Sequence, residues 1–152
     1  MAEISFRGLD EFALSLKEVA ELPDEVVDEI LNAGADVTVE AQRAEARKLG
    51  RPGGYWNAKQ KRSYATGGTA LSIKKGKVKV KDGKRVLYLT PVGTRARGKA
   101  KTRNAEIAFL NEFGTKTIQA RGFLRKANEE SAAEATAAQA AVYNKFLEAK
   151  GL

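Results

Sequence analysis

The fold is decided by residues 23–50, which read PDEVVDEILNAGADVTVEAQRAEARKLG. Apolar residues recur there at intervals of three and four, which predicts an amphipathic helix with one buried stripe. The predicted stripe consists of Val27, Ile30, Leu31, Val37, Ala41, Ala44 and Leu49. Pro23 suits the start of a helix, and Gly50 followed by Pro52 ends it. We expect one helix of about 25 residues.

Two further helices are predicted on either side of this segment. Residues 8–20 have apolar side chains at helical spacing, which indicates a short N-terminal helix. Residues 122–149 contain a dense run of alanines, which favours a long C-terminal helix. Alanine buries little area, so this helix needs a packing partner from this chain or from a neighbouring one.

Residues 71–92 alternate in polarity and predict strands joined by a tight turn at Asp82-Gly83. We expect the lysines at positions 75, 77, 79 and 81 to share one solvent-exposed face, with residues 72, 74, 76, 78 and 80 on the buried face. The chain is therefore predicted to be one α+β domain, residues 1–152, with a small antiparallel sheet packed against the long helix. The basic segments near 51–68 and 93–104 are predicted to be mobile loops.

A short helix is predicted after the second basic loop. Asn104 is expected to cap it, and Ile107, Phe109 and Leu110 are expected to point inward.

The residue inventory argues against an enzyme. The chain contains neither histidine nor cysteine, which removes the usual proton shuttle, the commonest metal ligand and thiol nucleophiles. Acidic residues cluster only on the predicted helical faces, and no Gly-Lys-Ser/Thr motif follows Gly67-Gly68. We expect no catalytic residue, metal, cofactor or small-molecule substrate. We also expect no membrane span, since no apolar run is long enough.

The charge is distributed unevenly along the chain. Residues 1–50 contain 5 basic and 12 acidic residues, residues 51–103 contain 16 basic residues and one acid, and residues 104–152 contain 6 of each. The basic block is either a solvated flexible region or a surface for phosphate or an acidic neighbour. We hypothesise that the acidic and basic segments attract each other across subunits, which makes assembly sensitive to salt.

Three short segments resemble the gene-product-ten-like family of tailed bacteriophages. The first is Thr66-Gly67-Gly68-Thr69-Ala70-Leu71-Ser72-Ile73, and the second contains the box Glu112-Phe113-Gly114-Thr115. The third, Ala120-Arg121-Gly122-Phe123-Leu124, resembles the family's alanine-arginine-proline-phenylalanine-leucine box, with Gly122 where the family usually has proline. The order of predicted elements resembles that of the family over nearly the whole chain.

This resemblance implies a structural role in a virion. It implies a head–tail joining or tail-completion protein that forms a homo-oligomeric, hexameric ring at the neck or at the top of the tail. The implied partners are further copies of the chain and neighbouring connector, stopper or tail proteins, with non-specific contact to genomic DNA in the lumen. Assembly would take place in the host bacterial cytoplasm. The alternative is a basic nucleic-acid-binding module.

Each candidate residue has a structural and a functional interpretation. Phe113 is expected to be buried, Gly114 to form a left-handed turn and Thr115 to bond the backbone, while Glu112 either pairs with Arg121 or Arg125 or contacts another subunit. Phe123 and Leu124 are expected to fill the core. The aromatic residues Tyr55, Trp56 and Tyr64 either anchor a loop or stack on bases.

The second basic loop carries a cation at every second position. If it is extended, the cations point to one side as a comb for phosphates or an acidic groove; if it is not, they are solvated. These residues are Arg95, Arg97, Lys99, Lys101 and Arg103.

Overall fold

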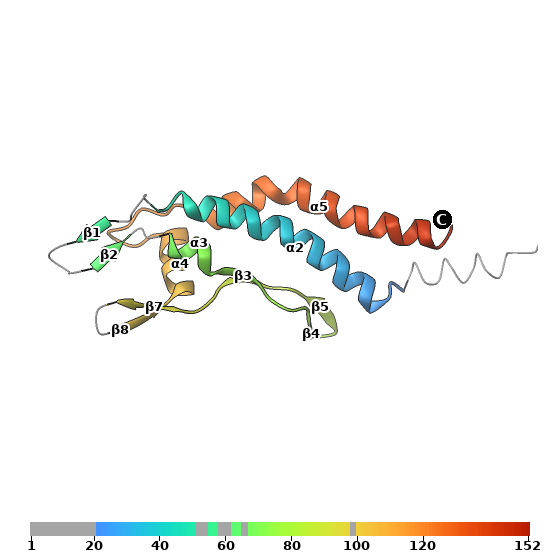
Figure 1. The fold of residues 1–152 in the computed structure, drawn as a ribbon, viewed down its shortest axis with the longest axis horizontal. Coiled ribbons are helices and arrows are strands. Elements are labelled where there is room, and N and C mark those ends of the chain that lie inside the picture. The colour runs from blue at the N-terminus through green and yellow to red at the C-terminus, as the bar shows by residue number, and fades with distance from the viewer. Residues whose placement is uncertain (1–20, 51–54, 58–61, 65–66, 98–99) are drawn as a thin grey trace, which may run out of the picture.

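Helix α2 (Asp24–Arg47) runs through the middle of the molecule, with helix α5 (Phe123–Ala149) on one side and a ribbon of short strands on the other (Figure 1). The structure is a computed structural model that describes residues 21–50, 55–57, 62–64, 67–97 and 100–152. The expected long central helix and long C-terminal helix are confirmed. The predicted helix at 8–20 lies outside the described residues.

Small side chains let α2 and α5 approach each other closely along antiparallel paths (Figure 1). Gly34, Ala35 and Ala46 of α2 are buried, as are Ala127 and Ser131 of α5. A Cβ atom added at Gly34 would lie only 2.6 Å from the side-chain amide nitrogen of Gln139. The C-terminal helix therefore finds its packing partner within its own chain.

The predicted stripe of α2 was wrong in its details. Ala44 is exposed, whereas Val39, Gln42 and Glu45 are buried although they lie outside the predicted stripe. The physical reason is that α2 is covered from two sides. α5 packs on one side, and helix α3 (Gly68–Ser72) with the strand ribbon packs on the other. The buried arc is therefore wider than a single stripe.

The ribbon is formed by four short strands that run out and back. Strand β3 (Ile73–Lys75) pairs with β6 (Leu89–Pro91), and β4 (Lys79–Lys81) pairs with β5 (Lys84–Val86), both antiparallel. The predicted turn at Asp82-Gly83 is confirmed, since both residues have positive φ, 51° and 72°, as a two-residue hairpin turn requires.

A β-bulge divides the ribbon and changes which side chains share a face. The N–H of Gly76 donates to the carbonyl of Tyr88, whereas Lys79 pairs with Val86. Lys77 and Val78 therefore lie opposite Leu87 alone. One extra residue in one strand reverses the alternation beyond it.

This bulge overturns the predicted division of the lysines. Lys75 lies on the face toward α2, where it forms an ion pair with Asp36. Lys74 is exposed on the opposite face. Val80, expected to be buried, is exposed.

Two further hairpins occupy segments predicted to be loops. Strand β1 (Tyr55–Asn57) pairs with β2 (Arg62–Tyr64), and β7 (Thr94–Arg97) pairs with β8 (Ala100–Arg103). The loop prediction was wrong for these residues. Basic, glycine-bearing segments with little apolar content predict loops, but in hairpins the backbone hydrogen bonds themselves order the chain. The rest of the two predicted loops lies partly outside the described residues.

Helix α4 (Asn104–Phe113) follows β8, but Asn104 does not cap it as predicted. The Asn104 side chain instead donates to the carbonyl of Val92 at 2.7 Å and accepts from Arg95 at 2.6 Å. Phe109, predicted to point inward, is also exposed. Neighbouring elements cover only part of α4. Some of its apolar side chains therefore stay exposed to solvent.

The core lies where α2, α3, β3, α4 and the start of α5 meet. Its buried residues are Val39, Ala46, Ala70, Ile73, Ala108 and Phe123. Phe123 is buried as predicted, and Leu124 packs against this core while partly exposed. The fold class is thus confirmed as α+β, with long helices and small antiparallel strand pairs. Among the described helices, none combines the length and apolarity that crossing a membrane would require.

The core makes a prediction about two neighbouring residues. Ile73→Ala is expected to lower the free energy of unfolding by about 2–4 kcal/mol, because Ile73 is completely buried. Leu71→Ala, two positions away and 80% exposed, should change it by less than about 0.5 kcal/mol. Urea denaturation measures both. Equal losses would contradict the packing described here.

Candidate assembly surface

Glu112 connects the box at residues 112–115 to the box at residues 120–124. Its carboxylate accepts the backbone N–H groups of Leu124 at 2.7 Å and Arg125 at 3.1 Å, in the first turn of α5. These N–H groups have no partner within the helix, and the positive end of the helix dipole favours an anion there. The predicted pairing of Glu112 with the side chains of Arg121 or Arg125 is therefore replaced by a cap on the helix backbone.

Backbone hydrogen bonds also join the C-terminal part of α4 to the residues just before α5. The N–H groups of Arg121 and Gly122 donate to the carbonyls of Asn111 and Glu112 at 2.8 and 3.1 Å. Gly114 has φ 76°, and a Cβ there would lie 2.6 Å from the backbone nitrogen of Ala120. Gly114 thus has a positive φ, but its ψ of −177° gives an extended conformation in place of the predicted left-handed turn, and only glycine fits it.

Gly122 has a geometry that proline cannot adopt. Its φ is 56°, and its N–H donates a hydrogen bond, whereas proline fixes φ near −65° and has no N–H. This explains in physical terms why this chain has glycine in the third box. Thr115 bonds the backbone as predicted, since its hydroxyl accepts the N–H groups of Thr117 and Ile118.

Phe113 does not fill the core, and the prediction that it is buried was wrong. It is 66% exposed and Phe109, one helical turn earlier, is 60% exposed. Their ring centroids are 4.7 Å apart, so the two rings form one continuous aromatic edge on α4. We call Phe109 and Phe113 the aromatic edge.

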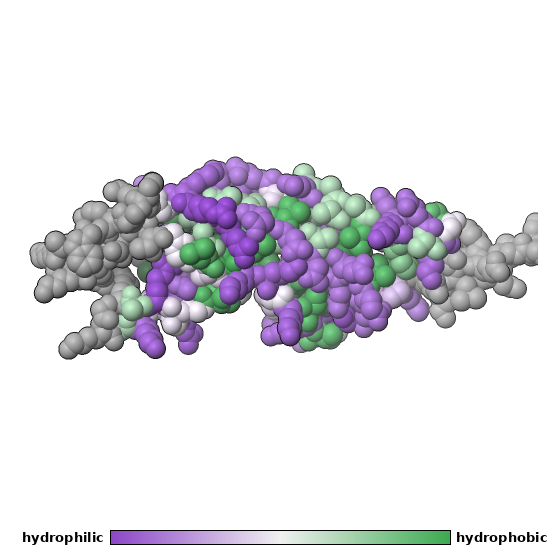
Figure 2. Space-filling model, in the orientation of Figure 1, coloured by the Kyte–Doolittle hydropathy of each residue, from purple (hydrophilic) through white to green (hydrophobic). Residues whose placement is uncertain are grey.

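Most of the other large exposed apolar residues lie between α3 and the start of α5. Within the described residues these are Leu71, Val80, Tyr88, Val92 and Ile118, with Leu152 the exception at the C-terminal end. Figure 2 shows hydrophobic patches beneath α2 and over the β4–β5 end of the ribbon, next to hydrophilic residues. The outward side of α5 instead has mostly alanine and charged residues. Exposed apolar surface with a polar surround is typical of a protein–protein contact.

Acidic residues of α2 hold the ribbon within the chain. Asp28 makes a two-pronged contact to Arg85 at 2.6 and 2.7 Å, and Asp24 contacts the same guanidinium at 2.8 Å. The hydrogen bond from Arg85 lowers the pKa of the Asp28 carboxyl below its usual value. Some of the acidic and basic residues that were expected to attract each other across subunits therefore pair within one chain.

Another ionic cluster lies between the two long helices. Glu45 is buried and forms ion pairs with Lys48 and Lys126. The hydrogen bond from Lys48 lowers the pKa of Glu45. Gln42 donates to Asn128 at 2.8 Å in the same contact. These polar residues fix the register of α5 on α2, although Glu45 lies outside the apolar stripe predicted for this helix.

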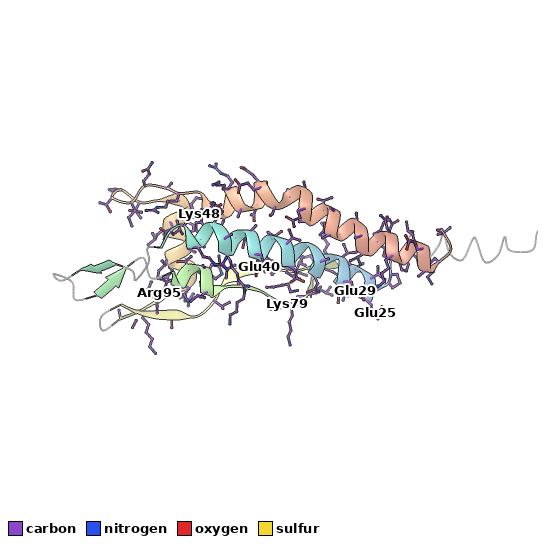
Figure 3. The ribbon with its side chains drawn as sticks, turned by 45° about the horizontal axis from the view of Figure 1, so that its top comes forward. Glu25, Glu29, Glu40, Lys48, Lys79 and Arg95 are labelled. Atoms are coloured by element: carbon purple, nitrogen blue, oxygen red, sulfur yellow. The ribbon has the colours of Figure 1, made fainter. Side chains whose placement is uncertain are left out.

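The outer face of the ribbon keeps its positive charge. The pairing places Lys79, Lys81 and Lys84 on the face opposite to Arg85, and Lys74 faces the same way before the bulge. All four lysines are exposed, and no described acidic group forms an ion pair with them. We call these four residues the lysine face. Figure 3 shows Lys79 on the ribbon side of the molecule.

The predicted comb of cations is divided by the β7–β8 hairpin. Arg95 is paired with Thr102, and Lys101 with Ala96, so Arg95 and Lys101 lie on opposite faces. Arg103 lies opposite Thr94 and shares the face of Lys101, while Arg97 is placed in β7 by its backbone pairing with Ala100. Lys99 lies outside the described residues. The prediction that all five cations point to one side is therefore wrong.

Arg95 has a structural role instead. Its guanidinium donates to Asn104 at 2.6 Å and to Thr69 at 3.1 Å, which ties β7 to α4 and α3. Partial burial lowers the pKa of Arg95. Sequence reasoning missed this network, because a cation in a basic segment gives no sign that its neighbours are polar and buried.

The segment at residues 66–73 lies partly in the core and partly on the surface. Ile73 is buried, Leu71 is exposed, and Gly67 precedes α3 with φ 77°. Thr66 lies outside the described residues. For Tyr55, Trp56 and Tyr64, the structure places the backbone in the β1–β2 hairpin.

Within the part of the chain that the structure describes, no three acidic side chains converge to hold a metal ion. Comparison with models of protein families, with curated proteins and with solved structures finds no match.

The junction at Glu112 gives a prediction. Glu112→Ala should lower the free energy of unfolding by roughly 1–2 kcal/mol, since two N–H groups of α5 lose their acceptor. Glu112→Gln keeps an acceptor oxygen but loses the charge, so it should lie between Glu112→Ala and the wild type. Thermal denaturation measured by circular dichroism tests this order. If all three proteins unfold together, Glu112 does not cap α5.

Proposed function

We propose that this protein is a structural head–tail joining or tail-completion protein of a tailed phage. In this proposal, copies of the chain form a closed ring at the neck or at the top of the tail, and the ring contacts connector, stopper or tail proteins. Its location is the virion, after assembly in the bacterial cytoplasm. The chain contributes no catalytic step and needs no cofactor.

One observation carries the proposal: the aromatic edge is exposed, and its Phe113 belongs to the Glu112–Thr115 box through which the chain resembles that phage family. Burying a phenylalanine side chain contributes about 1.5–3 kcal/mol. A ring repeats the same contact at every subunit boundary, so a modest contact is multiplied by symmetry. The rigid junction between α4 and α5 supports this role, because it fixes the direction in which the edge points.

A second candidate function, a basic nucleic-acid-binding module, is favoured by the lysine face. Cations without acidic partners are able to neutralise phosphates, and binding would then weaken steeply with salt. This candidate accounts for the charge of the ribbon but gives the aromatic edge no partner. Joining through protein contacts accounts for the aromatic edge directly.

The test replaces the aromatic edge with polar residues. Phe109→Ser/Phe113→Ser should remain folded, since both side chains are largely exposed, but should no longer form rings visible by negative-stain electron microscopy. Leu152→Ser, at an exposed apolar position at the C-terminal end and outside α4 and the ribbon, serves as the control and should still assemble. Rings formed equally by the double variant and the wild type would contradict the proposal.

A further inference from the structure

We infer that the lysine face of one copy binds the acidic N-terminal edge of α2 in a second copy. The acidic edge consists of Glu21, just before α2, and Glu25 and Glu29 in its first two turns. This inference rests on the proposed assembly role and specifies one of its contacts.

The lysine face concentrates positive charge that no acidic residue described by the structure neutralises. Lys81 lies directly opposite Lys84 in the β4–β5 pair, and Lys79 lies on the same face two residues away. Like charges directly opposite in a strand pair are destabilising. Asp82 is the one acidic residue on this hairpin. An anionic partner would relieve this repulsion.

The acidic edge is the matching surface. Glu25 and Glu29 lie one turn apart on α2 and are both exposed (Figure 3). Such like-charge pairs weaken a helix unless cations lie nearby. Arg85 attracts Glu25, but each of its three guanidinium nitrogens already contacts a carboxylate oxygen of Asp24 or Asp28. Glu29 has no ion-pair partner among the described residues.

The two surfaces do not meet within one molecule. The lysine face points away from α2, because the opposite face of the ribbon carries Lys75 and Arg85 toward it. Since the two described surfaces lie apart in one molecule, the acids are assigned to a second copy. A contact between two different patches of the same chain is head-to-tail, and its repetition gives a ring or a filament. Nucleic acid would satisfy the lysine face but would leave the acidic edge unexplained.

The experiment reverses the charge of each surface separately in the full chain. Lys79→Glu/Lys81→Glu makes both surfaces acidic, and Glu25→Lys/Glu29→Lys makes both basic. Each variant alone should associate at least roughly tenfold more weakly at low ionic strength, measured by sedimentation velocity. An equal mixture should recover association, because each reversed surface then meets its opposite on the other variant.

The matched control is Arg47→Glu/Lys145→Glu, which changes net charge by the same amount as the lysine variant at exposed positions outside the lysine face. It should associate like the wild type, and all variants should keep the wild-type helical signal. Association of the wild type should weaken as salt rises, since added ions screen exposed charges.

The possible outcomes separate this inference from the proposed function. If the wild type associates but both charge variants associate equally well, the contact is wrong and the assembly role stands. If the wild type stays monomeric, both fall. If Lys79→Glu/Lys81→Glu associates normally but loses binding to a DNA duplex, the lysine face serves nucleic acid and the inference is overturned.

Discussion

Close packing around a single helix is the constraint on which the rest of the structure depends. α5 and the ribbon each use one face against α2 and leave the other face free. Among the large side chains that the structure describes, only Ile73 is completely buried. A layer one helix thick cannot bury all the apolar residues that it carries. The free side of α4 therefore keeps two phenylalanines in solvent, which supports the proposal that other copies cover them.

The Glu112 junction turns this layered packing into a fixed shape. The carboxylate caps α5, and Gly114 and Gly122 adopt backbone angles that other residues adopt poorly. α4 and α5 thus meet as one unit, and the exposed rings of α4 are held at a constant angle to the long helices. The boxes at residues 112–115 and 120–124 form this junction, so their role within this chain is structural.

Much of the fold could be predicted where local signals decide the outcome. Pro23 and Gly50 bracket α2 closely, and Asp82-Gly83 forms the expected turn because the dipeptide itself adopts that geometry. Which face of each helix or strand is buried could not be predicted, because burial depends on the elements that pack against it. Nothing in the alternating sequence signals the bulge at Lys77-Val78, which turns Lys75 toward α2. The exposure of Phe109 likewise follows from how little of α4 its neighbours cover.

The central claim is that the exposed side of α4 and the ribbon is covered by further copies of the chain. Sedimentation equilibrium of the wild-type protein over a range of concentrations tests it most directly. The account predicts that the mass rises with concentration to a fixed multiple of the 16.5 kDa chain, as a closed ring requires. A mass that stays at that of one chain at every concentration would contradict it.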